Sequence, residues 1–208
     1  YNGVDLLHFH PGLREELRAA TRRRLGIAED ACVVLFVGSG FERKGVGAFL
    51  RALAARREPG WAIIAGKDKH AADYGRLAVK LRIAGRVRFT GAVSDVRPFL
   101  AAADAFVLPT LYDPFPNDAL EAMACGLPVV TSTTCGAAEI VREGENGFVR
   151  DALDHDGLAQ CLDRLDPKVL TEPEGLYFST IHQTVDHILV VGELWRLRLQ
   201  GESPIVDF

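Results

Sequence analysis

Short apolar runs alternate with amphipathic segments along most of this chain. The apolar runs are rich in β-branched residues, and most end at a glycine or a proline, which is typical of buried strands in a parallel sheet. One such run, residues 32–37, is entirely apolar and ends at Gly38. The predicted strands are residues 32–37, 61–65, 87–90, 105–108 and 128–130.

The segments between these runs carry apolar residues at helical spacing. In residues 45–57, Val46, Phe49, Leu50 and Leu53 recur every three or four positions, so they would lie on one face of a helix. The predicted helices are residues 45–57, 71–83, 95–103, 117–124 and 156–165, with a short helix at 136–142.

Strands that alternate with helices at this spacing form βαβ units. We therefore expect an α/β fold with a Rossmann-like, doubly wound and mainly parallel sheet. In open sheets of this kind, ligands bind outside the carboxyl ends of the strands. The candidate site consists of the loops at 38–44, 66–69, 91–94 and 109–118.

Composition and charge fit a soluble globular protein. Hydrophobic residues make up 48% of the 208 residues and charged residues 25%, and the formal net charge is −4. This charge argues against a nucleic-acid binder that relies on bulk positive charge, although a local basic pocket is compatible with it. The apolar runs are too short to span a bilayer, and the first residues lack the core of a signal peptide, so a cytoplasmic location is expected.

The cysteines and histidines do not form a recognisable metal site. The four cysteines contain no C-x-x-C pair and fit no zinc spacing, so we predict no metal ligands and interpret them as buried free thiols in a reducing compartment. The histidines have no carboxylate or cysteine at ligand spacing and are interpreted as non-catalytic. The residues in question are Cys32, Cys125, Cys135, Cys161, His8, His10, His155, His182 and His187.

The loop after the first strand could hold phosphates. Gly38, Ser39 and Gly40 let the backbone approach a ligand closely, and Arg43 and Lys44 offer a fork of donors beside a point charge. The glycine spacing matches neither a Walker loop nor a dinucleotide fingerprint. The alternative is a glycine-rich turn with two solvated cations.

Two carboxylates eight positions apart, Asp113 and Glu121, bracket the start of the helix at 117–124. A carboxylate at Glu121 is costly to bury without a partner, and it could accept bonds from two vicinal ribose hydroxyls. The helix start near Asn117 and Asp118 suits a pyrophosphate. The alternatives are a turn residue before a proline at 113, a helix cap at 117 or 118, and a solvent-facing glutamate at 121. A nucleotide sugar would fit the first set of roles.

Two further loops have both a structural and a functional interpretation. After the second strand, Gly66 and Lys67 contact a nucleotide, or Asp68 caps the next helix beside solvated lysines. Before the short helix, we expect Thr134 to act as a cap, because Cys135 has no histidine nearby in sequence to activate it.

An ordered set of motifs from residue 1 to about residue 165 resembles a known family. The motifs are Asn2-Gly3-Val4-Asp5, Phe9-His10-Pro11, Phe36-Val37-Gly38-Ser39, Arg43-Lys44-Gly45, Phe89-Thr90-Gly91, Ala102-Ala103-Asp104, Pro109-Thr110, residues 113–130 and Gly144-Glu145-Asn146-Gly147-Phe148. They resemble the C-terminal, donor-binding half of retaining GT-B glycosyltransferases of the "glycosyl transferases group 1" class. Residues 37–46 and 134–136 resemble, more narrowly, glucosyltransferases that add the first glucose to the lipopolysaccharide inner core.

The resemblance implies a role for each candidate residue. Arg43 and Lys44 would bind the donor diphosphate and stabilise the departing charge, Glu121 would hold the ribose, and Asp113 would face the transferred sugar. The further expected contacts are Phe115, Pro116 and Asn117 with the sugar, the amides of Asp118 and Ala119 with the phosphates, and Gly91 and Val93 with the base. The family usually has glutamate where this chain has Asp113, and many members have glycine where it has Pro116, so the sugar end of the site departs from the family pattern.

The resemblance also implies an activity and a domain organisation. The donor would be a nucleotide-diphosphate sugar, with a UDP-sugar favoured, and neither a metal nor a cofactor would be needed. Residues 1–20 would be the interdomain linker and first helix, 21–166 the donor-binding domain, and 167–208 a helical C-terminal extension. A missing N-terminal domain would bind a saccharide or lipid-linked acceptor, which is compatible with peripheral contact at the inner face of the membrane. The isolated chain would then transfer poorly. The alternatives are a sugar-nucleotide epimerase-like domain and a non-catalytic nucleotide-binding module.

Overall fold

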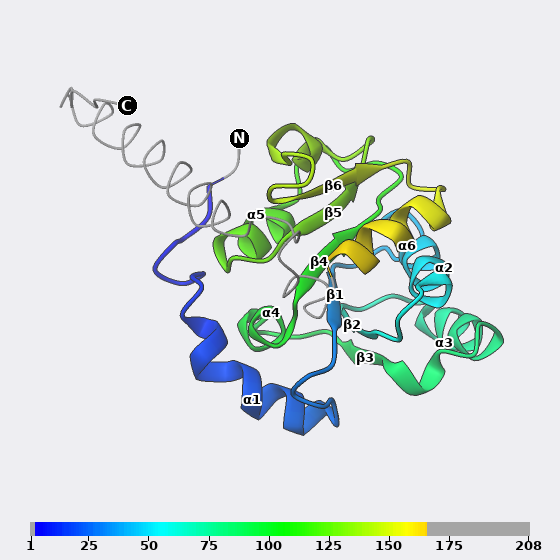
Figure 1. Ribbon diagram of the computed structural model, residues 1–208, viewed down its shortest axis with the longest axis horizontal. Helices are drawn as coiled ribbons and strands as arrows, with labels where there is room; N and C mark the ends of the chain where they lie inside the picture. The colour runs from blue at the N-terminus through cyan, green and yellow to red at the C-terminus, as the bar shows by residue number, and fades with distance from the viewer. Residues whose placement is uncertain (1–2, 166–208) are drawn as a thin grey trace.

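The computed structural model describes residues 3–165, which form a six-stranded sheet with helices on both faces (Figure 1). Every neighbouring pair of strands is parallel, in the order β3-β2-β1-β4-β5-β6. The strands are β1 Val33–Val37, β2 Trp61–Ala65, β3 Val87–Gly91, β4 Ala105–Leu108, β5 Val129–Ser132 and β6 Gly147–Arg150. The predicted Rossmann-like, doubly wound fold is confirmed.

The helices form two layers. Helices α2, α3 and α6 pack together on one face of the sheet, and α1 packs on α4 on the other, where α5 also lies (Figure 1). Their bounds are α1 Leu13–Leu25, α2 Val46–Ala55, α3 Ala71–Lys80, α4 Arg97–Ala102, α5 Asn117–Ala124 and α6 His155–Arg164, with short 3₁₀ helices at Ala84–Arg86 and Gly136–Ile140.

Helix α3 ends earlier than its apolar pattern predicts. The pattern continues to Ile83, but Arg82 adopts a left-handed conformation with φ of 60°. The amide of Ile83 then bonds the carbonyl of Ala78, and the amide of Arg82 bonds that of Val79, at 3.0 and 2.9 Å. This arrangement is a Schellman closure built on an arginine instead of a glycine.

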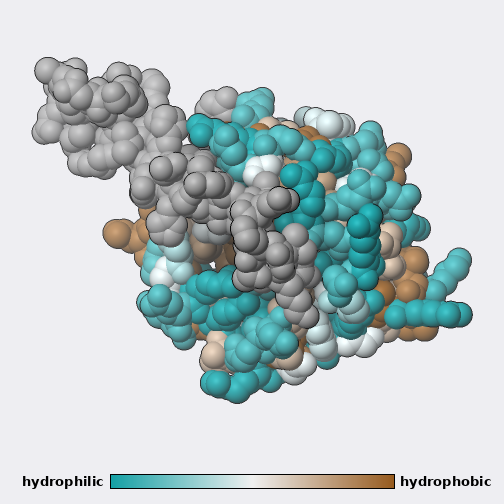
Figure 2. Space-filling view, in the orientation of Figure 1, coloured by the Kyte–Doolittle hydropathy of each residue, from teal (hydrophilic) through white to brown (hydrophobic). Residues whose placement is uncertain are grey.

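The hydrophobic core lies on both sides of the central strands. Val33, Leu35 and Phe36 of β1 and Phe106 of β4 have no exposed surface. The visible surface is mostly hydrophilic, with apolar residues gathered at its rim (Figure 2). Among the residues described, no helix has the length and apolar character needed to cross a membrane.

A buried ion cluster fastens α1 to the sheet. Asp104, just before β4, accepts a hydrogen bond from the amide of Val33 at 2.8 Å. Its carboxylate also pairs with Arg14, Arg18 and Arg22 at 3.0, 2.6 and 2.8 Å. These arginines are four residues apart and therefore share one face of α1. Sequence reasoning did not find the cluster.

Arg22 is fully buried, and all three nitrogens of its guanidinium donate hydrogen bonds. Its Nε donates to the carbonyl of Ala102 at 2.9 Å, and its Nη1 donates to three carbonyls between residues 28 and 31. Burial alone would raise the pKa of Asp104, but Arg22, Arg18 and the amide of Val33 outweigh it and hold the pKa below the ordinary value.

Two of the expected boundaries can be compared with the structure. Helix α1 runs across the boundary expected after residue 20. The segment expected to form a C-terminal extension, 167–208, lies outside the described residues.

Glycines at the strand ends let neighbouring loops approach closely. The amide of Gly38 bonds the carbonyl of Ala65, and the amide of Gly66 bonds that of Gly91, both at 2.9 Å. Gly66 has φ of 151°, and a Cβ at this position would stand 1.8 Å from the carbonyl oxygen of Gly38. Three of the glycines predicted to line the site, at 38, 66 and 91, therefore form one row across the ends of β1, β2 and β3.

Replacing Asp104 should destabilise the fold strongly. Asp104→Asn leaves the buried guanidinium of Arg22 without its counter-charge, so we expect a loss of about 3–5 kcal/mol in the free energy of unfolding, measured by urea denaturation. The control is Asp73→Asn, which removes one partner of an exposed pair with Arg76 and should cost less than about 1 kcal/mol.

The stabilising effect of Asp104 should depend on pH. Because the pKa of Asp104 is depressed in the folded state, its contribution to the free energy of unfolding is present above the unfolded pKa of about 3.9. This contribution is lost as pH falls through the folded pKa. The difference in free energy of unfolding between the wild type and Asp104→Asn should therefore become smaller in acid. Equal losses of stability in Asp104→Asn and Asp73→Asn near pH 7 would contradict the buried cluster.

The close approach at Gly66 gives a second stability test. Gly66→Ala places a methyl group against backbone in a conformation that alanine rarely adopts, so we expect a loss of at least about 1–3 kcal/mol. The control is Gly75→Ala in α3, where a Cβ meets nothing within 4 Å and helix propensity favours alanine by about 1 kcal/mol. Thermal unfolding of both variants should show opposite shifts in Tm, and a shift of the same sign would show that the loop is more open than described.

Candidate functional site

The loops that follow β1, β4 and β5 meet at the carboxyl edge of the sheet. The carbonyl of Arg43 accepts bonds from the hydroxyl of Thr110 and the amide of Leu111, at 3.0 and 2.8 Å. The carbonyl of Thr110 in turn accepts from the hydroxyls of Ser132 and Thr134, at 2.5 and 2.7 Å. This network holds the three loops together at the point where the strand order reverses between β1 and β4. Such a switch point is where open α/β sheets bind ligands.

Asp113 is held rigidly within this edge. It is buried, its amide reaches the carbonyl of Thr134 at 3.4 Å, and its carbonyl accepts from the amide of Gly136 at 2.8 Å. The predicted capping role of Thr134 is wrong. The N-cap residue of the 3₁₀ helix is Cys135, whose side chain makes no capping bond, and the Thr134 hydroxyl donates to the carbonyl of Thr110 instead.

The two cations of the first loop meet the carboxylates around α5. Lys44 Nζ lies 2.5 Å from Asp118 Oδ2 and 3.8 Å from Asp113 Oδ2. Arg43 Nη1 lies 3.4 Å from Asp113 Oδ2 and donates to the carbonyl of Tyr112 at 2.5 Å. The side chain of Lys44 is 11% exposed and that of Arg43 is 50% exposed, so the alternative of a freely solvated cation is wrong for Lys44.

The stem of Lys44 lies across Gly38. A Cβ at Gly38 would stand 2.6 Å from Lys44 Cδ and 2.8 Å from its Nζ, and Gly38 has φ of 141°. The glycine therefore leaves space for the lysine to reach the start of α5. Ser39 and Gly40, the next residues of the loop, are exposed.

Helix α5 begins at Asn117, as predicted. Pro116 is its N-cap residue and no side chain caps this end, so the capping roles considered for Asn117 and Asp118 are wrong. Asp118 instead turns to Lys44, which leaves the first-turn amides of α5 without a side-chain acceptor from the cap.

Glu121 lies one turn further along α5. Its side chain is partly buried, and burial, with a further contribution from Asp118, raises its pKa, while Lys44 opposes the shift. A fully solvent-facing glutamate, the structural alternative, is therefore wrong. A partly desolvated carboxylate suits hydrogen bonds from neutral hydroxyls.

The loop after β2 is joined to the loop after β1. Asp68 accepts bonds from the amide of His70 at 2.7 Å and from that of Phe41 at 2.8 Å, and these bonds lower the pKa of Asp68. It does not cap α3, whose N-cap residue is His70, so that expectation is wrong. Lys67 is exposed at the rim of this loop.

The other predicted residues are divided between the edge and the interior. Phe115 is half-buried near Gly136, and Pro116 and Ala119 are buried beneath the start of α5. Val93, in the loop after β3, packs against the hydrophobic core beyond the exposed Gly91. Sequence reasoning placed Thr110 in a candidate loop without a role and did not assign Ser132 to the site, yet these two residues join the loops to one another.

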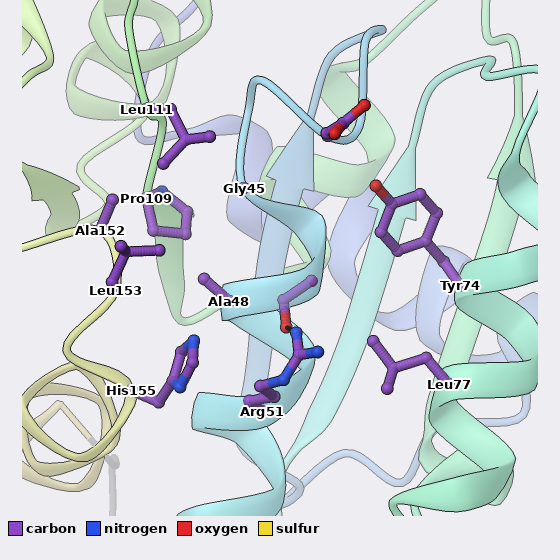
Figure 3. A pocket seen from close by; sticks show the side chains of 12 residues that line it. Gly45, Ala48, Arg51, Tyr74, Leu77, Pro109, Leu111, Ala152, Leu153 and His155 are labelled. Carbon is purple, nitrogen blue, oxygen red and sulfur yellow. Dashed lines mark hydrogen bonds between the residues drawn. The ribbon is translucent and has the colours of Figure 1, made fainter.

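A surface cavity of about 460 Å³ lies beside α2, outside the cluster around Lys44 (Figure 3). Figure 3 shows α2 in the middle, with α3 on one side and the loops after β4 and β6 on the other. The lining residues include Tyr74, Leu77, Pro109, Leu111, Leu153 and His155. It shares Glu42 and Gly45 with the loop after β1, and Pro109 and Leu111 with the loop after β4, but none of the side chains to which a role was assigned line it.

All four cysteines are buried and none forms a disulfide bond, as predicted. Burial raises the pKa of Cys125 to about 12 and that of Cys161 to about 11, and it also raises the pKa of Cys135 beside Asp113. These thiols stay protonated near neutral pH and are poor nucleophiles. Within residues 3–165, no group of three or more histidine, cysteine or acidic side chains could hold a metal ion.

Comparison with known sequences identifies a family. The family described as "Glycosyl transferases group 1" matches residues 31–166. The chain is 38% identical to the lipopolysaccharide core biosynthesis glycosyltransferase LpsE of Rhizobium meliloti over 150 residues, and this match covers 71% of this chain and 43% of LpsE. It is also 35% identical to the lipopolysaccharide glucosyltransferase WaaG of Escherichia coli over 136 residues, and this match covers 64% of this chain and 36% of WaaG. The chain thus spans less than half the length of these relatives.

A solved structure agrees with the sequence relatives. Anabaena HepE, crystallised in complex with UDP and glucose, superposes with a TM-score of 0.71 at 25% identity, over 92% of this chain and 56% of HepE. The match confirms the predicted Rossmann-like half of a GT-B fold. This chain belongs to the glycosyl transferases group 1 family, with lipopolysaccharide core glycosyltransferases among its relatives.

Proposed function

We propose that this chain is the donor-binding domain of a hexosyltransferase that uses a nucleotide-diphosphate sugar. The observation that carries the proposal is the meeting of Lys44 with Asp113 and the start of α5 at the switch point of the sheet. A cation beside a helix N-terminus suits a diphosphate, and carboxylates on either side suit the hydroxyls of a sugar and a ribose. HepE, crystallised with UDP-glucose, supports UDP as the nucleotide.

In this proposal the diphosphate lies between the loop after β1 and α5. Lys44 Nζ and the exposed guanidinium of Arg43 stabilise the negative charge that grows on the diphosphate as it leaves, and the amides of Asp118 and Ala119 add to this stabilisation. These groups take the role that a metal ion has elsewhere, which is why we propose a metal-independent reaction.

The two remaining carboxylates orient the sugar and the nucleotide. Glu121, whose pKa is raised, accepts hydrogen bonds from the ribose hydroxyls, and Asp113 accepts from hydroxyls of the transferred hexose. Asp113 reaches one methylene less far than a glutamate, but its backbone is bonded on both sides to the 134–136 segment, and its carboxylate faces Arg43 and Lys44 at 3.4 and 3.8 Å. Pro116 offers no amide to the sugar. Phe115 and Asn117 complete the proposed sugar pocket.

The proposed reaction proceeds with retention. The hydroxyl oxygen of the acceptor attacks the anomeric carbon on the face from which the diphosphate leaves. The bond from that carbon to the diphosphate breaks, a bond to the acceptor oxygen forms, and the hydroxyl proton passes to the departing diphosphate. We propose a saccharide of the lipopolysaccharide core as the acceptor, bound by a further domain, with the enzyme in the cytoplasm at the inner face of the membrane. The relatives LpsE and WaaG support this choice.

Nucleotide binding tests the donor site directly. Calorimetric titration with UDP, GDP and ADP should show a preference for UDP. Lys44→Ala should weaken UDP binding by about 1.5–3 kcal/mol, because a charge-assisted hydrogen bond to phosphate is lost. Lys80→Ala, which removes an exposed charge at the end of α3, is the control and should leave the affinity unchanged. Binding of none of the nucleotides would instead favour a non-catalytic scaffold.

Transfer activity tests the division of labour between domains. The 208-residue chain should bind UDP-glucose but transfer glucose to a lipopolysaccharide-core oligosaccharide at least about 100-fold more slowly than a full-length relative such as WaaG, because the proposal assigns the positioning of the acceptor to a further domain. The measurement is release of UDP with and without the oligosaccharide. Transfer by this chain alone at a rate similar to that of WaaG would contradict the proposed dependence on a second domain.

A further inference from the structure

The ammonium of Lys44 is already engaged by carboxylates. Its short contact is with Asp118 Oδ2 at 2.5 Å, and Asp113 Oδ2 lies further away at 3.8 Å. The Lys44 side chain is 11% exposed and that of Asp118 is 23% exposed, so water screens this pair only partly. The group assigned to the donor diphosphate therefore has an internal anionic partner of its own.

The charges around Lys44 are unfavourable for a second anion. Asp113, Asp118 and Glu121 face Lys44, and Arg43 is the other cation in contact with this group. Burial is the main cause of the raised pKa of Glu121, and the negative charge of Asp118 adds to it. A diphosphate placed beside Lys44 would meet the carboxylate of Asp118 at close range.

Asp118 is better placed to give way than Asp113. The backbone of Asp113 is bonded on both sides to the 134–136 segment, and its carboxylate also faces Arg43. Asp118 is in the first turn of α5, where its side chain accepts no bond from the helix end. A change of its side-chain rotamer would release Lys44 without moving the backbone.

We propose that Asp118 is a built-in competitor of the donor diphosphate for Lys44. The inference rests on the proposed function. A diphosphate binds to Lys44 by displacing the Asp118 carboxylate, and Asp118 takes Lys44 back when the nucleoside diphosphate product leaves. Asp118 thereby lowers affinity for the nucleotide and speeds product release, which makes it a residue that tunes turnover.

A positioning role for Asp118 would give the opposite result. If the carboxylate served to aim Lys44 at the phosphates, its loss would weaken nucleotide binding. If it competes, its loss must strengthen binding. The sign of the change in UDP affinity therefore separates the two roles.

The experiment is a double-mutant cycle in the 208-residue chain, with UDP as the probe. Calorimetry is carried out on the wild type, Asp118→Asn, Lys44→Ala and the double variant. Asp118→Asn should bind UDP roughly fivefold or more tightly, since an ion pair of about 1 kcal/mol no longer opposes binding. This gain should vanish in the Lys44→Ala background, because the competition acts through that ammonium. Stopped-flow displacement should show slower UDP release from Asp118→Asn.

Asp156→Asn is the matched control. Asp156 is the second residue of α6, as Asp118 is of α5, and it is exposed. The substitution removes the same charge from the same helical position away from Lys44, so UDP affinity should not change.

Each other outcome overturns one specific statement. Weaker or unchanged UDP binding by Asp118→Asn, with measurable binding by the wild type, would overturn the competitor role and leave the proposed function standing. A gain that persists in the Lys44→Ala background, or appears equally in Asp156→Asn, would show a general effect of charge and would also overturn it. No binding of UDP by any variant would overturn the proposed function itself.

Discussion

The parallel direction of all six strands is the constraint on which the rest of the molecule depends. Parallel neighbours require a crossover between successive strands, so each helix has to cover a face of the sheet. The same geometry brings every strand's carboxyl end to one edge. Because the order reverses between β1 and β4, the chain leaves these two neighbours toward opposite faces. The loop that carries Lys44 and the loop that carries Asp113 are therefore brought together from positions far apart in the sequence.

Much of this framework could be predicted from the sequence because it follows from local patterns. Buried parallel strands are apolar runs, and the bounds of β4 and α5 agree with the predicted ones. The candidate loops follow from the strand ends, which is why Arg43, Lys44 and Asp113 could be proposed as site residues from the sequence. The end of α3 was not found, since nothing in the sequence signals that Arg82 adopts a left-handed conformation.

The partners of individual side chains could not be predicted, because they depend on tertiary placement. An aspartate near a helix start reads as a cap, yet Asp118 binds Lys44 and Asp68 binds the amide of Phe41. A threonine before a short helix reads in the same way, yet the hydroxyl of Thr134 serves the loop after β4. The spacing of the three arginines in α1 was visible, but their common acceptor, Asp104, lies more than eighty residues away.

The cluster around Asp104 also determines how firmly the N-terminal part of the described chain is attached to the sheet. Three guanidinium groups join α1 to the carboxylate, and through it to the first amide of β1 and the turn before β4. Helix α1 is thus fixed in position against the sheet. A force on residues 3–12 would therefore act through α1 on the centre of the sheet. The turn before the helix is held to it as well, because the amides of Leu13 and Arg14 bond the carbonyls of His10 and Pro11, at 3.2 and 3.0 Å.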